Sequence, residues 1–268
     1  MKTINFSVLM SVYKKEQAAY LDECLRSLVC QSLPPSEVIL VEDGPIPEDL
    51  NNIIEKYSRI LPMKIVRIEK NGGLAAALNV GLKHCSNELI VRMDTDDVSL
   101  PYRFERQVKY MLSHPDIDVS SAWIEERDEK MANVLFIKKL PLGHNDILKF
   151  SKKRNPISHP VSIFKKSAVM SVGGYPDVFP EDYALWSLLL VNKFIFSNIP
   201  ETLLYMRTGP DFMGRRGFNL FKGEMRLLNY QKSIGFLSFY EFFISFMIKV
   251  VLRLSPLKFR EFLYKFAR

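Results

Sequence analysis

The sequence is poor in cysteine and lacks the short patterns that mark several common protein classes. Its three cysteines, Cys24, Cys30 and Cys85, form no Cys-x-x-Cys pair, which argues against a disulfide framework and a zinc ribbon and favours a reducing compartment. No Gly-x-Gly-x-x-Gly and no P-loop pattern occurs, so a Rossmann dinucleotide site and a P-loop are poor interpretations. Repeats and low-complexity tracts are also missing, and 47% of the residues are apolar, as in a folded protein.

Positive charge is unevenly distributed along the chain. The apolar run at residues 6–13 is short and no small-residue cleavage site follows it, so we expect no signal peptide. The formal net charge is +7, and residues 218–268 alone hold nine Lys or Arg against three Glu. These charges alternate with aromatic and aliphatic side chains, a mixture that favours a membrane surface over nucleic acid as the partner.

The N-terminal part alternates apolar runs with helical patterns. Runs at residues 6–13, 37–41, 64–68 and 88–93 predict strands, and helical spacing predicts helices at 21–28, 53–60 and 74–84. This alternation is typical of a doubly wound α/β fold, and 268 residues suit one large domain plus an appended segment. Beyond it we expect helices at 103–112 and from 179 to 190, extended segments at 119–124 and 134–138, and a loop at 155–160.

Polar signals follow three of the predicted strands, where ligands bind in such sheets. The strongest is Asp94-Thr95-Asp96-Asp97, in which three carboxylates would repel one another unless a cation or solvent relieves the repulsion. Carboxylate oxygens suit Mg²⁺ or Mn²⁺, ions that are usually shared with substrate phosphates. A solvated acidic turn would have the same sequence, and the tetrapeptide alone does not separate the two interpretations.

Two further segments are ambiguous when taken alone. The glycine-rich turn at residues 71–73 precedes a small-residue helix that would approach a ligand or the sheet closely. Glu181 and Asp182 begin an apolar helix, where acidic residues are also favoured by the helix dipole.

The order of these segments resembles the family 2 glycosyltransferases with the GT-A fold, over roughly residues 5 to 210. The elements that carry the resemblance are Ser11-Val12-Tyr13, Val41-Glu42-Asp43-Gly44, Asn71-x-Gly73 with Asn79 and Gly81, Asp94-x-Asp96-Asp97, and Gly173-Gly174-Tyr175 before Glu181-Asp182. Within the family the chain is similar to bacterial enzymes of O-antigen and exopolysaccharide synthesis. There the segments Asn155-Pro-x-x-His159-Pro160 and Gly214-Arg215-Arg216-Gly217 also have counterparts.

The resemblance implies a role for each motif. The nucleotide-sugar would be bound by Tyr13, Glu42, Asp43, Asn71, Gly73, Asn79, Asp94, Thr95 and Asp96. A Mn²⁺ or Mg²⁺ ion would be held by Asp96 and Asp94, and the catalytic base would be Asp182. The acceptor would contact Glu181, His159, Arg215 and Arg216, although a lone loop histidine before proline is more often structural. Glu42 departs from the Asp of many relatives, which makes its nucleotide contact less certain.

The implied reaction is inverting transfer of a hexose from a UDP-sugar, UDP-galactose or UDP-glucose, to a saccharide on undecaprenyl diphosphate. The Gln-x-x-Arg-Trp signature of processive synthases is absent, which favours a single addition. The enzyme would work at the cytoplasmic face of the inner membrane. Two other functions remain as alternatives, a nucleotidyltransferase and a non-catalytic sugar-binding protein. The first would normally have a glycine-rich phosphate loop after the first strand, and the second would have lost its carboxylates, so the sequence favours the glycosyltransferase over both.

The C-terminal segment has two interpretations. Residues 236–254 approach the length of a membrane span, but Glu241, Lys249 and Arg253 count against spanning. We expect helices that lie in the membrane interface, and the alternative is a helical pair packed on the main domain. The predicted architecture is therefore a mostly parallel α/β sheet flanked by helices at residues 1–215, followed by a basic, aromatic, membrane-associating segment at 216–268.

Overall fold

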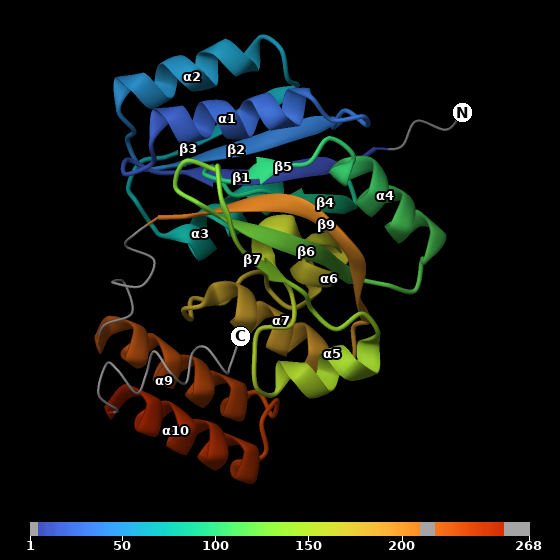
Figure 1. The fold of residues 1–268 in the computed structure, drawn as a ribbon, viewed down its shortest axis with the longest axis vertical. Helices are drawn as coiled ribbons and strands as arrows, with labels where there is room; N and C mark the ends of the chain where they lie inside the picture. Colours follow the sequence, from blue (N-terminus) through green and yellow to red (C-terminus); the bar gives the residue numbers. More distant parts are fainter. Residues whose placement is uncertain (1–4, 210–217, 255–268) are drawn as a thin grey trace.

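A computed structural model of the chain describes residues 5–209 and 218–254 (Figure 1). The strands are β1 (Ser7–Val12), β2 (Glu37–Asp43), β3 (Met63–Ile68), β4 (Leu89–Arg92), β5 (Val98–Ser99), β6 (Val119–Asp128), β7 (Val134–Lys138), β8 (Ile163–Lys165) and β9 (Phe196–Thr208). The helices are α1 (Ala18–Val29), α2 (Glu48–Ser58), α3 (Leu74–His84), α4 (Arg103–Ser113), α5 (His144–Ser151), α6 (Lys166–Ser171), α7 (Glu181–Val191), α9 (Phe218–Ser233), α10 (Phe239–Leu254) and the 3₁₀ turn η1 (His159–Val161).

All described strands belong to one sheet in the order β3-β2-β1-β4-β8-β6-β9-β5, with β7 paired to β6. The first four strands along this path are parallel, whereas β8 is antiparallel to both of its neighbours. The order reverses at β1, which lies between β2 and β4, so the carboxyl ends of these strands flank a topological switch point. The mixed, mostly parallel α/β fold predicted from the sequence is confirmed.

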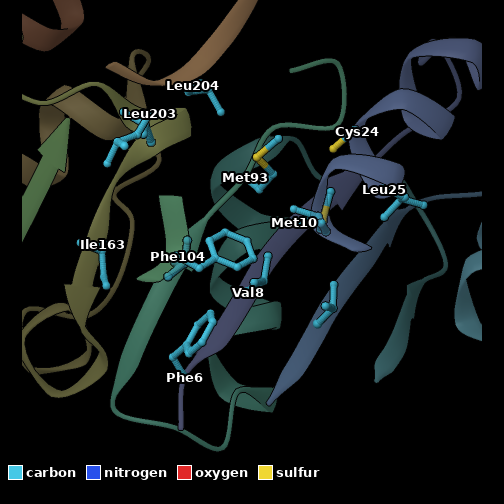
Figure 2. Packing of buried hydrophobic residues seen from close by; sticks show 14 of the residues in the cluster. Phe6, Val8, Met10, Cys24, Leu25, Met93, Phe104, Ile163, Leu203 and Leu204 are labelled. Atoms are coloured by element: carbon cyan, nitrogen blue, oxygen red, sulfur yellow. The ribbon is translucent and has the colours of Figure 1, made fainter. Parts of the chain in front are cut away.

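Apolar side chains fill both faces of the sheet. One cluster joins β1 and β2 to α1, α2 and α4, and Figure 2 shows Phe6, just before β1, and Val8 and Met10 of β1 packed beside Phe104. The other joins the opposite face to α3, α7 and part of α9. Strands buried on both faces explain the continuous apolar runs of the sequence.

Helix α3 lies unusually close to the sheet. A Cβ atom at Gly81 would come within 2.4 Å of Leu9 Cδ1 and 2.8 Å of Val41 Cγ2. Only glycine therefore fits this contact, and the small-residue helix predicted to approach the sheet does so.

The described part of the C-terminal segment packs on the main domain. Leu228 of α9, and Phe236 and Leu237 after it, belong to the same apolar cluster as Trp186 of α7. Gln231 Nε2 also donates a hydrogen bond of 2.8 Å to Ser187 Oγ of α7. Helix α10 packs on α9 as the outer layer (Figure 1). No helix among residues 5–209 and 218–254 is long and apolar enough to cross a membrane.

Most predicted elements are present, with differences at their ends. The helix expected from residue 179 begins at Glu181, and the segment expected at 119–124 extends to Asp128 because it pairs with the long strand β9. The short strands β5 and β8 were not predicted, since two or three residues carry no measurable periodicity.

Candidate active site

The acidic loop follows β4 and leads into β5. Asp94 Oδ1 accepts an ion-paired hydrogen bond from Arg92, whose side chain is only 1% exposed. Thr95 Oγ1 donates a hydrogen bond of 2.5 Å to Glu16 Oε2, and Asp97 Oδ1 accepts one of 2.9 Å from the Arg207 backbone N–H. The loop is therefore fixed by separate contacts with Arg92, Glu16 and Arg207.

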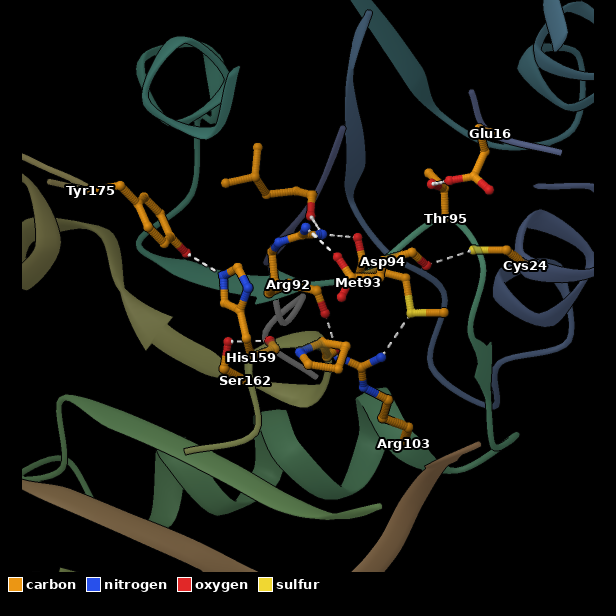
Figure 3. A network of polar contacts seen from close by, with 12 residues as sticks. Glu16, Cys24, Arg92, Met93, Asp94, Thr95, Arg103, His159, Ser162 and Tyr175 are labelled. Carbon is orange, nitrogen blue, oxygen red and sulfur yellow. Dashed lines mark hydrogen bonds and ion pairs between the residues drawn. The ribbon is translucent and has the colours of Figure 1, made fainter. Parts of the chain in front are cut away.

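Two buried arginines support this loop (Figure 3). Arg92 contacts the backbone oxygens of Leu9 and Met93, and Arg103 donates to the backbone oxygens of Arg92 and Pro160. Cys24 Sγ donates a hydrogen bond of 3.3 Å to the Asp94 backbone oxygen. Guanidinium groups below a carboxylate loop offset part of its negative charge, so three acids can lie close together here.

Asp96 lies where the negative charge is most concentrated. Burial, with the charges of Asp94 and Glu16, raises its pKa to about 7, and burial and the charge of Asp96 raise the pKa of Asp97 as well. The donor set, carboxylate oxygens under mutual repulsion, fits a hard divalent cation. Within the described residues no group of three or more His, Cys, Asp or Glu side chains forms that could hold a metal ion. Asp94 and Asp96 offer two carboxylates, one of which already pairs with Arg92, so their binding of an ion stays a prediction.

The segments that follow β2 and β3 interlock. The Asp43 carboxylate accepts hydrogen bonds from Gly72 N at 2.7 Å, Gly73 N at 3.0 Å and Asn71 Nδ2 at 2.8 Å. Gly44, at φ +83°, lies so close to Asn71 that a Cβ atom would be 2.8 Å from its backbone nitrogen. Three predicted nucleotide contacts are thus brought together: Asp43 from the end of β2, and Asn71 and Gly73 from the loop after β3.

Glu42 and Tyr13 border the same edge of the sheet. Glu42 Oε2 pairs with Arg67 Nε at 2.9 Å, whereas its Oε1 is buried without a hydrogen-bond partner among the described residues. Tyr13 follows β1 and is 41% exposed. A buried acceptor and an exposed ring at the switch point are suited to the N–H and the face of a nucleobase.

The second acidic site is at the N-terminus of α7. Asp182 Oδ2 accepts a hydrogen bond of 2.6 Å from Asn155 Nδ2. Burial and the charge of Asp182 raise the pKa of Glu181 to about 7. Burial lowers the pKa of Lys138 on β7, and the charges of Asp182 and Glu126 oppose this change, which places a cation beside the second acidic site.

A buried histidine lies between the two acidic sites. His159 Nε2 is 3.1 Å from the Tyr175 hydroxyl, and its ring meets Trp186 of α7 edge to face. Burial lowers the pKa of His159 to about 4, an effect that Arg92 strengthens and Asp182 and Asp94 oppose. A neutral, 8% exposed ring with a side-chain partner supports the structural interpretation of this histidine.

Asn79 holds the loop that carries Tyr175. Its Oδ1 accepts from Tyr175 N at 2.7 Å and its Nδ2 donates to Tyr175 O at 2.8 Å. A Cβ atom at Gly174 would lie 2.3 Å from Asn79 Oδ1, so glycine is required for this contact. Asn79 therefore acts on the protein itself, and its contact with a nucleotide stays a prediction. The predicted acceptor contacts Arg215 and Arg216 lie outside the described residues.

Comparison with known proteins identifies the family of this arrangement. The sequence model of the family described as "Glycosyl transferase family 2" matches residues 7–173. The chain belongs to glycosyl transferase family 2. One relative, "Amylovoran biosynthesis glycosyltransferase AmsE" of Erwinia amylovora, is 40% identical over 97% of this chain and 98% of its own length. Another, the "UDP-Gal:alpha-D-GlcNAc-diphosphoundecaprenol beta-1,3-galactosyltransferase" of Escherichia coli, is 37% identical over 98% and 96%.

Solved structures share the fold of this family 2 glycosyltransferase at low sequence identity. The mannosyltransferase PcManGT from Pyrobaculum calidifontis, in complex with GDP-Man and Mn²⁺, is 15% identical and has a TM-score of 0.67 over 98% of this chain and 79% of its own. S. aureus TarS 1-349 in complex with UDP-GlcNAc is 20% identical, with a TM-score of 0.66 over 84% of this chain and 66% of its own.

Several residues of the glycosyltransferase site were missed by sequence reasoning. Glu16, Arg92 and Lys138 were not singled out, and Asn155 was noted only as part of a motif. Arg92 gave one available signal, because a charge within an otherwise apolar buried strand needs a partner. The contacts of Glu16, Lys138 and Asn155 depend on tertiary packing alone.

Proposed function

We propose that this glycosyltransferase transfers a hexose from a UDP-sugar, with inversion, to a saccharide carried on undecaprenyl diphosphate. The observation that carries the proposal is the pairing of an acid loop at the sheet's switch point with a second acid at the start of α7, in a chain 37% identical to the E. coli galactosyltransferase. The same relative supports UDP-galactose as the donor over UDP-glucose, and synthesis of a surface polysaccharide as the pathway.

The nucleotide would lie along the carboxyl ends of β1, β2 and β4. Tyr13 and the Oε1 atom of Glu42, which has no partner among the described residues, would face the nucleobase. The Asp43–Asn71–Gly73 arrangement would form the wall beside it. Thr95 and Asp94 would border the ribose and diphosphate. These assignments follow the place of each residue in the fold.

Asp94 and Asp96 would hold a Mn²⁺ or Mg²⁺ ion together with the donor diphosphate. When bound, such an ion stabilises the negative charge of the leaving group. The residues of the chain itself position the loop: Arg92 from below, Glu16 through Thr95, and Arg207 through Asp97.

Asp182 would accept the proton of the acceptor hydroxyl. The hydroxyl oxygen forms a bond to the anomeric carbon, the carbon–oxygen bond to UDP breaks with its electron pair left on the diphosphate, and the proton remains on Asp182. One displacement inverts an α-linked donor to a β product, the linkage in the name of the E. coli relative. Glu181 and the predicted contacts Arg215 and Arg216 are assigned to the acceptor side, whereas the buried ring of His159 keeps a structural role.

The acceptor lipid would bring residues 216–268 to the cytoplasmic face of the inner membrane. Helix α10 exposes an uninterrupted apolar stripe on one face: Phe239, Tyr240, Phe243, Ile244, Met247 and Ile248. Two of its charged residues pair with the rest of the protein, Glu241 with Lys152 at 3.6 Å and Lys249 with Glu224 at 3.3 Å. An apolar stripe beside a basic segment suits the interface of an anionic bilayer.

The transfer is tested by incubating the purified enzyme with UDP-galactose, Mn²⁺ and a synthetic GlcNAc-diphospho-lipid. We expect release of UDP that requires the acceptor, with a β linkage in the product by NMR. Release of UDP without acceptor, or no release with a panel of UDP- and GDP-sugars, would contradict the proposal. A nucleotidyltransferase would instead release pyrophosphate when it is given UTP and a sugar 1-phosphate, and a binding protein would release neither product.

The membrane contact is tested with vesicles of phosphatidylglycerol and phosphatidylcholine. Replacing Phe243 and Ile244 with lysine should weaken binding at least about tenfold, because two apolar side chains no longer enter the bilayer. Ile60→Lys is a matched control, since Ile60 is 58% exposed at the end of α2. Unchanged vesicle binding would contradict the membrane contact and show that the stripe has another partner.

A further inference from the structure

The contact between Asn155 and Asp182 joins two segments that lie 27 residues apart. Asn155 Oδ1 is already used by its own loop, as the acceptor of a 3.3 Å hydrogen bond from Ile157 N. The orientation of the amide is therefore defined, and its NH₂ group is the part that meets Asp182. An NH₂ group donates and cannot accept, so Asp182 Oδ2 is the acceptor of this contact.

The loop that carries Asn155 is anchored to the sheet. Asn198 of β9 donates to Pro141 O at 2.6 Å and to Pro156 O at 3.1 Å, and its Oδ1 accepts from Ser121 Oγ at 2.5 Å. Ser121 Oγ also accepts from Ser158 N at 3.3 Å. Asn155 is thus held from β6 and β9, while Asp182 is held on α7.

Charged and titratable groups surround Asp182 on several elements. They are Lys138 on β7 with Glu126 and Arg154 acting on it, Glu181 and Tyr183 on α7, His159 in η1, and Tyr175 in the loop before α7. Burial raises the pKa of Glu181 to about 7, so this neighbour retains its proton more readily. The charge of Asp182 contributes to this change in Glu181, whereas the hydrogen bond from Asn155 is made to Asp182, so the two acids have different surroundings.

We propose that Asn155 is the positioning residue of the reaction: it binds Oδ2 of Asp182, fixes the orientation of the carboxylate and leaves Oδ1 to accept the proton of the acceptor hydroxyl. This inference rests on the proposed function, in which Asp182 is the base. Asn155 touches the base and takes no part in bond formation itself.

The test compares kcat, the acceptor KM and the dissociation constant of UDP between Asn155→Ala and the wild type, with UDP-galactose and a GlcNAc-diphospho-lipid. Loss of a hydrogen bond to a charged group should lower kcat by about 10- to 100-fold. The acceptor KM and the dissociation constant of UDP should stay nearly unchanged, because only the orientation of the Asp182 carboxylate is altered. Asn155→Asp should lower kcat further, because it places a second acid against the base.

Asn192→Ala is the matched control, since Asn192 caps the other end of α7 through a 2.8 Å hydrogen bond to Leu188 O. It removes an amide at the other end of the helix that carries Asp182 and should leave kcat unchanged. If Asn155→Ala lowers only the folded fraction, with the kcat of the folded enzyme unchanged, Asn155 is merely structural and the inference is overturned.

A readout without turnover separates this inference from the proposed function. The carboxyl carbon of Asp182 can be followed by ¹³C NMR in aspartate-labelled protein, with Asp182→Asn to assign the signal. At pH 8 its chemical shift should change in Asn155→Ala and stay unchanged in Asn192→Ala, because only the first variant removes a hydrogen bond from this carboxylate. A changed chemical shift in a protein that releases no UDP would support the contact and refute the transfer reaction, and an unchanged chemical shift would refute the contact.

Discussion

Lowering the pH from 8 to 5 is expected to destabilise the protein through His159. Burial lowers the pKa of this histidine from 6.5 to about 4. Above pH 6.5 the ring is neutral in the folded and the unfolded chain, and it contributes nothing to the pH dependence. Below pH 6.5 the unfolded chain binds a proton that the folded chain does not, so stability is lost as the pH falls toward 4.

The size of this loss follows from the pKa difference. At ~1.4 kcal/mol for each pKa unit, the change from 6.5 to about 4 corresponds to ~3 kcal/mol in full, of which ~2 kcal/mol is lost by pH 5. Glu181 acts in the opposite direction, because its pKa is raised from 4.5 to about 7 and its contribution is lost as the pH rises through that range. Comparison of variants is therefore needed to isolate His159.

The assay is urea denaturation at pH 8 and pH 5 for the wild type, His159→Gln and His84→Gln. His84 is exposed in the last turn of α3 and serves as the matched control. The difference between the two pH values should be smaller by ~2 kcal/mol in His159→Gln, and nearly unchanged in His84→Gln. If His159→Gln loses as much stability as the wild type between these pH values, the ring is not held neutral and the reasoning is refuted.

The remaining predictions concern the base, the metal and the packing of α3. Asp182→Asn should lower kcat by about 10² to 10⁴ with UDP binding nearly intact, whereas Glu181→Gln should act on acceptor KM; more than about a tenth of wild-type kcat in Asp182→Asn would contradict the assignment. Asp96→Ala should abolish turnover, and full wild-type activity in excess EDTA would exclude a metal there. Gly81→Ala should cost ~1–3 kcal/mol by urea denaturation, because its Cβ would overlap side chains of the sheet, and Gly143→Ala, with open space, should cost far less.

The sequence predicted the parts of the fold that have a clear period. The four parallel strands are buried on both faces and appear as apolar runs, and α3 carries the small residues that its close packing requires. The sequence did not predict β8 or the return of β9 beside β6. These elements depend on pairings between segments far apart along the chain, for which local patterns carry no signal.

The candidate site shows the same division. Its acids were found because carboxylates clustered after an apolar strand are costly without a partner. Their partners were not found, because Asn155 and Lys138 have ordinary neighbours in the sequence. The role of Asn79 also depended on the fold, since nothing in its helix indicates that both of its polar atoms bind the backbone of Tyr175.

The packing between the two acidic sites explains why their separation should be rigid. Arg92 pairs with Asp94 on one side, and on the other the Tyr175 hydroxyl meets His159, whose ring packs against Trp186 of the helix that begins at Glu181. Loops alone would allow the acid loop and the start of α7 to drift apart, whereas buried side chains at native packing density move little. The distance between the acid loop and Asp182 is therefore determined by the protein core. Donor and acceptor specificity can then vary through the outer loops without altering that distance.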